Sequence, residues 1–228
     1  MHKASDRAWL AGLTVGLGLT LVAAYAPLPP SGGTMCAYLG LLLRAALYLR
    51  DGGVLTRLFQ MGIVAGLFEL PIDWWLIHGI SNGRLDYLGA PDVVLLASPI
   101  WMPLAWACVI VELGYPAVRL SQKYSPVLVT IGVAISAGVT IGFYEYFAYR
   151  AGWWKYAKAN VMIGDFCAAY IPLGEAFMFL AFLPVARRLL ARGRYPLASA
   201  VEAGASFALA IFGGYALAYA ILELGRTP

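Results

Sequence analysis

The strongest constraint on the fold is a series of seven long apolar segments, separated by short stretches that hold most of the charged residues. A helix needs about 20 mostly apolar residues to cross the hydrocarbon core of a bilayer, and these segments approach or exceed that length. Lipid cannot satisfy free backbone amides, and the segments lack the alternation of a barrel strand, so each is expected to be helical. The sequence predicts an all-α, polytopic membrane bundle of about seven transmembrane helices.

We expect a single transmembrane domain over residues 1–228, with spans at about 8–25, 35–49, 55–77, 93–113, 126–147, 161–183 and 197–224. Hydrophobic residues make up 61% of the chain and charged residues 12%, against roughly 45–50% and 25% in soluble domains. This composition excludes a water-soluble domain, a disordered chain and a nucleic-acid partner. Lys3 and Arg7 precede the first segment as in a signal peptide, but the apolar run is long for one, and we interpret it as a retained span.

Lysine and arginine residues are divided unevenly between the two sides of this predicted bundle. Eleven of the 16 lie on the side of the N-terminus, four of them between the sixth and seventh spans. Because cytoplasmic loops of membrane proteins are enriched in these residues, the sequence predicts a multi-pass protein with a cytoplasmic N-terminus. Its C-terminus would lie on the opposite side of the membrane.

Cysteine and histidine are too few and too scattered for a metal centre. Cys36, Cys108 and Cys167 fall in apolar spans at unrelated spacings, and the two histidines are His2 and His78. We therefore expect no disulfide framework, no metal and no cofactor.

Two stretches of the sequence resemble each other. Gly66-Leu67-Phe68-Glu69 corresponds to Gly142-Phe143-Tyr144-Glu145, and Leu85-Asp86-Tyr87 corresponds to Trp154-Lys155-Tyr156. In each copy a proline follows the tyrosine by sixteen residues. We interpret this as a weak internal repeat of two helix-loop-helix units, which places the two glutamates at equivalent positions.

Acidic residues inside apolar spans are the clearest candidates for a site, because each costs roughly 2.5–3.5 kcal/mol to insert at a helix centre. Glu69 and Asp73 are four residues apart and share one helical face. Glu145 ends the fifth span and Glu175 lies within the sixth. The topology places all four in the half of the bundle away from the N-terminus. Hydrogen bonding across helices, or pairing with Arg44 or Arg150, is the alternative role for these acids.

Aromatic residues are concentrated in the same part of the chain, with six of the seven tryptophans between residues 74 and 154. An interfacial aromatic belt explains those near the ends of spans. Two others fall within the predicted fourth span, where a belt is not expected. As candidates for a substrate-binding lining we name Trp74, Trp101, Trp106, Tyr144, Trp153 and Tyr156.

A buried carboxyl group with few cationic partners tends to stay neutral, because a low dielectric disfavours the anion. Such a group can protonate an alkene or an epoxide, and aromatic faces stabilise the resulting carbocation. Membrane terpene and carotenoid cyclases use this chemistry, which needs neither metal nor nucleotide. The sequence has no phosphate loop, no Asp-rich diphosphate motif and no dinucleotide fingerprint.

We therefore predict a metal-independent isoprenoid cyclase whose catalytic residues are Glu69, Glu175, Asp73 and Glu145. Glu69 and Glu175 would act as general acid and base, and the other two would tune them or relay protons. The expected partners are a lipid-soluble isoprenoid or sterol-like substrate and the surrounding membrane lipids.

Two motifs carry a resemblance to a known family. Gly152-Trp153-Trp154-Lys155-Tyr156, followed by Ile171–Phe179, resembles the lycopene cyclase domain of bacterial and fungal carotenoid enzymes. That family has repeated helical units with a tryptophan-tyrosine loop and a proline-glutamate helix, but with paired glutamates where this chain has Gly174-Glu175. In size, spans and intramembrane acids the chain also resembles small integral-membrane terpene cyclases. The resemblance implies cyclisation by acidic residues on separate helices.

Other functions stay open on the sequence alone. A sterol or lipid isomerase would use similar proton chemistry, whereas in a small lipid-binding protein or proton-coupled transporter the acids would carry protons or bind a cation. A cyclase predicts a closed cavity open laterally to lipid, and a transporter predicts a polar path to both faces. A retinal protein is excluded, because the last span, 197–224, has no lysine.

Overall fold

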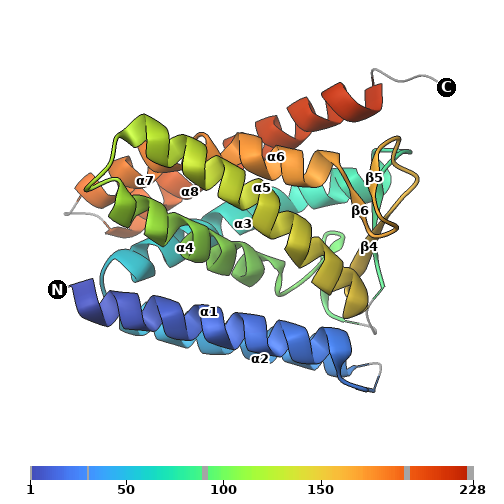
Figure 1. Ribbon diagram of the computed structural model, residues 1–228, viewed down its shortest axis with the longest axis horizontal. Helices are drawn as coiled ribbons and strands as arrows, with labels where there is room; N and C mark the ends of the chain where they lie inside the picture. Colours follow the sequence, from blue (N-terminus) through green and yellow to red (C-terminus); the bar gives the residue numbers. More distant parts are fainter. Residues whose placement is uncertain (1, 30, 89–91, 193–195, 225–228) are drawn as a thin grey trace.

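The computed structural model describes residues 2–29, 31–88, 92–192 and 196–224, which form a helical bundle with short strands gathered at one end (Figure 1). The helices are α1 (His2–Tyr25), α2 (Gly32–Arg50), α3 (Val54–His78), α4 (Met102–Leu120), α5 (Pro126–Arg150), α6 (Tyr170–Phe179), α7 (Phe182–Ala191) and α8 (Pro196–Tyr219), which runs on into the π-helical turn η1 (Ala220–Leu224). The strands are β1 (Arg84–Tyr87), β2 (Val94–Leu95), β3 (Ser98–Pro99), β4 (Trp154–Ala157), β5 (Met162–Ile163) and β6 (Cys167–Ala168).

Within the described residues, six helices are long and apolar enough to cross a membrane, namely α1 to α5 and α8. α6 and α7 are shorter, at ten residues each, and are separated by two residues. They are interrupted near Pro184, which has no N–H to continue the helical ladder. The predicted all-α membrane bundle of about seven helices is therefore confirmed.

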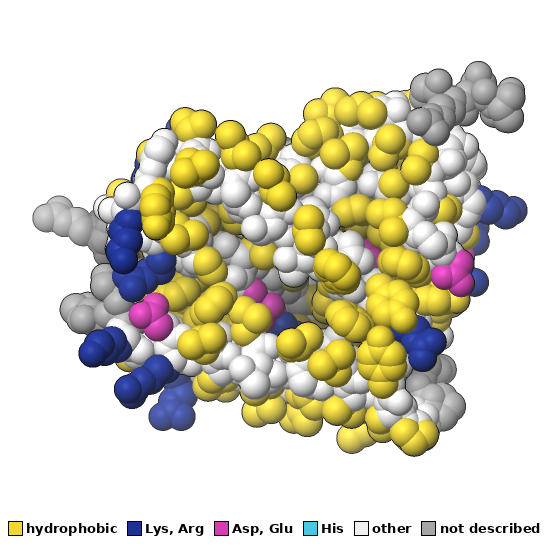
Figure 2. All heavy atoms as spheres, in the orientation of Figure 1, with side chains coloured by type: hydrophobic (Ala, Val, Ile, Leu, Met, Phe, Trp, Pro, Cys, Tyr) yellow, Lys and Arg dark blue, Asp and Glu magenta, His cyan; other side chains and the backbone are white. Residues whose placement is uncertain are grey.

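The two ends of the bundle differ in structure. One end, which we call the strand end, carries β1 to β6. The other carries the turns that join α2 to α3 and α4 to α5. We call it the basic end, because Arg50, Arg57, Arg119 and Lys123 lie at or beside these turns. α1 begins at the basic end and η1 finishes at the strand end (Figure 1). Hydrophobic side chains cover the middle of the face in Figure 2, and lysine and arginine side chains gather towards its ends.

The internal repeat is present in the fold as two successive units of helix, strand, hairpin and helix. The first unit runs from α3 through β1, β2 and β3 to α4, and the second from α5 through β4, β5 and β6 to α6. β1 and β4 pair antiparallel, with Leu85 opposite Tyr156 and Tyr87 opposite Trp154. In the repeat, Leu85 corresponds to Trp154 and Tyr87 to Tyr156. Replacing each residue by its counterpart turns one of these two pairs into the other, so a local two-fold axis passes through the β1–β4 ribbon.

Glycines allow the two helices of each unit to pack closely. A Cβ at Gly62 of α3 would lie 2.5 Å from Cα of Ala107 in α4. At the equivalent position of the second unit, a Cβ at Gly138 would lie 3.3 Å from Cβ of Ala176 in α6. The same small-residue contact therefore fixes the helix pair in both units.

Two predicted spans, 93–113 and 161–183, are wrong at their starts. Residues 94–99 form the β2–β3 hairpin and residues 162–168 the β5–β6 hairpin, so that α4 begins at Met102 and α6 at Tyr170. Short apolar runs cannot be assigned to helix or strand by hydropathy alone. Both helical segments extend beyond their predicted ends, to Leu120 and Ala191.

Candidate active site

A cavity lies at the strand end, where both repeat units and α8 meet beneath the β1–β4 ribbon. It contains about 570 Å³ of empty space, counting the part that opens outward. It is lined by Glu69, Asp73 and Leu76 of α3, Leu85 and Tyr87 of β1, Met102, Ala105, Trp106 and Val109 of α4, Ile141, Tyr144 and Glu145 of α5, Trp154 and Tyr156 of β4, Glu175 of α6 and Tyr215 of α8.

The β1–β4 ribbon covers the cavity with one of its two faces. Successive side chains of a strand point to opposite sides, so Leu85 and Tyr87 share a face of β1 while Trp154 and Tyr156 share a face of β4. All four line the cavity. The register places these two pairs opposite each other. Together they form a continuous, largely aromatic surface that covers the cavity.

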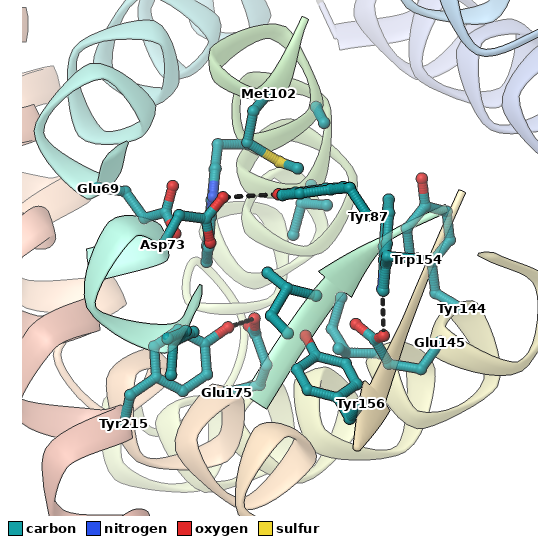
Figure 3. A pocket seen from close by; sticks show the side chains of 16 residues that line it. Glu69, Asp73, Tyr87, Met102, Tyr144, Glu145, Trp154, Tyr156, Glu175 and Tyr215 are labelled. Carbon is teal, nitrogen blue, oxygen red and sulfur yellow. Dashed lines mark hydrogen bonds between the residues drawn. The ribbon is translucent and has the colours of Figure 1, made fainter. Parts of the chain in front are cut away.

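The four acidic residues that the sequence singled out all line this cavity. They come from three helices, and the exposed fraction of each is 5% or less. Figure 3 shows the side chains of Glu69 and Asp73 on one side of the cavity and those of Glu145 and Glu175 across it. Four carboxyl groups therefore meet in one buried space.

Asp73 is the most fully hydrogen-bonded of the four. Its Oδ2 atom accepts hydrogen bonds from the hydroxyl groups of Tyr87 and Ser98, each at 2.7 Å. Burial and then the neighbouring charge of Asp73 hold the pKa of the Tyr87 hydroxyl well above its ordinary value. Tyr87 therefore stays protonated and acts as a lasting donor to Asp73.

Glu145 and Glu175 each have one side-chain donor. Trp154 Nε1 donates to Oε2 of Glu145 at 2.5 Å, and Tyr215 Oη donates to Oε1 of Glu175 at 2.7 Å (Figure 3). Both donors are buried residues that also line the cavity. Each carboxyl group is thus oriented by an aromatic side chain from another element.

Two of the four carboxyl groups retain an oxygen without a partner. These atoms are Oε2 of Glu69 and Oε2 of Glu175, both buried. Among the described residues that line the cavity there is no lysine, arginine or histidine. Arg44 instead pairs with Glu112 at 2.8 Å, so the alternative in which Arg44 neutralises one of the four acids is wrong.

Three of the six predicted aromatic residues, Trp106, Tyr144 and Tyr156, line the cavity, whereas Trp74, Trp101 and Trp153 do not. Trp74 follows Asp73 on α3 and therefore points about 100° away from it, with 49% of its surface exposed. Trp101 precedes α4 instead of lying mid-span, and its Nε1 donates to Asp92. Trp153 is turned to the far side of the ribbon, where it lies with Trp101 against α2.

Comparison with known proteins gives one match, to a family described as "Domain of unknown function (DUF6989)", over residues 70–222. The chain belongs to this family. No curated protein and no solved structure matches the chain. The DUF6989 match contains Asp73, Glu145, Glu175 and Tyr215, and it begins one residue after Glu69.

Sequence reasoning missed four residues of the candidate site within the DUF6989 region: Ser98, Tyr87, Trp154 and Tyr215. The period-two pattern of strands could have identified Trp154, because it lies two residues from the predicted Tyr156. Tyr215 gave no signal, since it lies 40 residues from Glu175 on a separate helix. In the described parts of the chain, no group of three or more histidine, cysteine or acidic residues is placed to hold a metal ion.

Proposed function

We propose that the protein is an integral-membrane isoprenoid cyclase that starts its reaction by protonating an alkene or an epoxide. One observation carries this proposal: four carboxyl groups, with no cationic partner in the part of the chain that the structure describes, converge in an apolar cavity lined by aromatic rings. The proposal also extends the resemblance to the lycopene cyclase domain and to small membrane terpene cyclases.

Hydrogen bonding around Asp73 supports Glu69 as the proton donor. Two hydroxyl groups donate to one oxygen of Asp73, and donors to a carboxylate stabilise its anionic form. Asp73 and Glu69 are close neighbours on α3, so ionisation of both would place two like charges side by side. We therefore assign the initiating proton to Glu69, whose Oε2 has no hydrogen-bond partner among the described residues. Glu69 acts as the general acid.

The opposite side of the cavity would complete the reaction. Proton transfer from Glu69 to the substrate leaves a carbocation, whose attack by a second double bond closes a ring. The faces of Trp106, Trp154 and Tyr144 stabilise the positive charge as it moves. Glu175, held by Tyr215, removes a proton from carbon through its unpaired Oε2 and leaves a new double bond. Glu175 then releases its proton to solvent and Glu69 takes up a new one from solvent, so the reaction needs no oxidant or reductant.

The charge of the cavity restricts its substrate. Phosphate and diphosphate groups are bound in proteins mainly by arginine, lysine and metal ions, and the lining has no basic side chain. The four acids would repel such a group. The substrate that fits is a neutral, lipid-soluble isoprenoid or a sterol-like molecule.

Packing beyond the cavity favours an enzyme over a proton-coupled transporter. Towards the basic end the bundle is filled by Ile110, Phe179, Phe182 and Phe207, all fully buried. A transporter needs a polar path that reaches both faces of the membrane, and these four buried apolar side chains interrupt such a path.

Isotope incorporation from the solvent tests the proposed reaction. Membranes containing the protein are incubated in D₂O with neutral linear isoprenoids and their terminal epoxides, and the products are analysed by mass spectrometry. We expect cyclic products that, for the alkenes, carry one deuterium on carbon. Acyclic products with shifted double bonds would identify an isomerase instead, and the absence of any turnover of either substrate set would contradict the proposal.

We expect Tyr215→Phe to lower kcat by about 10-fold or more. A hydrogen bond to a charged group contributes about 1.5–3 kcal/mol, and Glu175 loses its only side-chain donor. KM and the thermal unfolding midpoint are expected to stay unchanged, because the ring still fills its place. Tyr219→Phe, one turn further along α8 and outside the cavity lining, is the matched control. Equal effects of the two variants would argue against a positioning role for Tyr215.

We also propose that the basic end lies in the cytoplasm, as the distribution of lysine and arginine favours. Lys123 and Lys158 are exposed residues at the basic end and the strand end. In intact cells, a membrane-impermeant maleimide is expected to label Lys158→Cys, made in a cysteine-free background. Lys123→Cys should react only after permeabilisation, and the reverse pattern would invert the orientation.

A further inference from the structure

A second hollow lies between α4 and α5, nearer the basic end. It contains about 850 Å³ of empty space, counting the part that opens outward. Its walls are Glu112, Leu113, Pro116, Ala117 and Leu120 on the α4 side, and Tyr124, Leu128, Val129, Gly132, Val133 and Ser136 on the α5 side. We call this hollow the α4–α5 groove.

The α4–α5 groove and the cavity that holds the four acids are both lined by α4 and α5. On α4 the cavity lining ends at Val109 and the groove lining begins at Glu112, within one helical turn. On α5 the groove ends at Ser136 and the cavity begins at Ile141, a little more than one turn away. The groove then follows α4 as far as Leu120, about 12 Å at 1.5 Å per residue. The two hollows therefore lie one after the other along α4 and α5, with the acids at one end.

The groove offers no free charge to an occupant. Glu112 is the one charged residue in its lining, and its Oε1 accepts hydrogen bonds from Arg44 at 2.8 Å and Tyr48 at 3.1 Å. The Arg44 pairing neutralises this carboxylate. The remaining walls are almost entirely apolar, so the groove suits an uncharged hydrocarbon chain and not a phosphorylated head group.

Helix packing leaves the groove open instead of filling it with side chains. A Cβ added at Gly132 of α5 would meet no atom within 4 Å, whereas one at Gly62 of α3 would clash with α4 at 2.5 Å. α4 therefore packs tightly on α3 and leaves room beside Gly132. Leu120 and Leu128, at the groove's edge, are exposed, which places its opening on the lipid-facing side of the bundle.

We propose that the α4–α5 groove holds the apolar tail of a linear isoprenoid substrate while its reacting end lies at the carboxyl cluster. This inference rests on the proposed cyclase function and adds that the substrate is longer than the cavity and enters sideways from the membrane. Chain length is then selected in the groove, away from the reacting groups.

Photo-crosslinking tests the groove without requiring turnover. The probes are neutral linear isoprenoid alcohols of ten and twenty carbons with a diazirine at the hydrocarbon end, applied to the protein in phosphatidylcholine nanodiscs. We expect the long probe to crosslink to peptides of α4 and α5 that line the groove, and the short probe to those that line the cavity. Unlabelled isoprenoid alcohol should displace the long probe, and added phosphatidylcholine should not.

Gly132→Leu places a side chain in the groove and is expected to lower crosslinking by the long probe at least about fivefold, leaving the short probe unaffected. Gly213→Leu is the matched control, because Gly213 of α8 is exposed, meets no atom within 4 Å and lies outside the groove. Equal labelling of Gly132→Leu and the wild type by the long probe, or displacement by phosphatidylcholine, would overturn the inference. Groove labelling without ring formation in the D₂O assay would overturn the cyclase function and leave the groove as a chain-binding site.

Discussion

Glu69→Gln is expected to lower turnover at least about 100-fold, while the protein still folds and inserts. General acid catalysis by a positioned side chain contributes typically about 10²–10⁴-fold, and an amide cannot supply the initiating proton. Glutamine matches glutamate in size and can still contact Trp106 and Asp73, which neighbour Glu69. Ring formation and solvent deuterium incorporation are measured together in membranes that contain equal amounts of each protein.

Glu175→Gln and Glu202→Gln complete this series. With Glu175 as the proposed base for the final proton, its replacement is expected to allow protonation but to divert the cation, so that products quenched by water replace the cyclic alkene. Glu202 lies on the exposed surface, where it pairs with Arg192, and its replacement should change nothing. Full activity in both Glu69→Gln and Glu175→Gln would refute the assignment of acid and base.

Gly66→Ala is expected to destabilise the protein by about 1–3 kcal/mol, whereas Gly142→Ala is expected to be neutral or stabilising. These glycines occupy equivalent positions in the two repeat units. A Cβ at Gly66 would lie 2.7 Å from Cα of Pro103, which is a clash with backbone, and overpacking of this kind costs about 1–3 kcal/mol. A Cβ at Gly142 would meet Pro172 at 3.9 Å, an ordinary contact, and alanine favours the helix.

Thermal unfolding in detergent compares the two variants directly. Gly66→Ala should also reduce activity, because α4 carries Trp106 and any retreat of α4 moves this ring away from Glu69. Equal unfolding midpoints for the two variants would show that the two units tolerate a methyl group equally. That result would contradict the closer contact of Gly66 with Pro103.

The bundle itself could be predicted from sequence because its cause is local. Runs of apolar residues demand helices in lipid whatever their neighbours are, and this placed α1, α2, α3, α5 and α8 close to their observed bounds. The two hairpins could not be predicted in this way. Their residues, such as Val94 and Ile163, are as apolar as a span, and only pairing with a neighbouring segment makes them strands.

The acids of the site could be predicted for a similar reason. Charge in an apolar span is conspicuous in the sequence, and topology alone placed Glu69 and Glu175 in the same half of the bundle. Their hydrogen-bond donors could not be found, since a tyrosine such as Tyr215 looks the same whether it faces lipid, water or a carboxyl group. Trp74 shows the converse error, because closeness to Asp73 in sequence does not decide which side of α3 a ring takes.

The two repeat units do not contribute equally to the cavity. Glu69 and Glu145 are equivalent, but Trp106 of α4 stands where the second unit has Glu175. A cavity with full two-fold symmetry would receive an elongated molecule equally well in either direction. Placing an indole in one unit where the other has an acid removes that ambiguity, because the two ends of the space now differ in chemistry. We therefore expect a molecule that binds there to have a head and a tail.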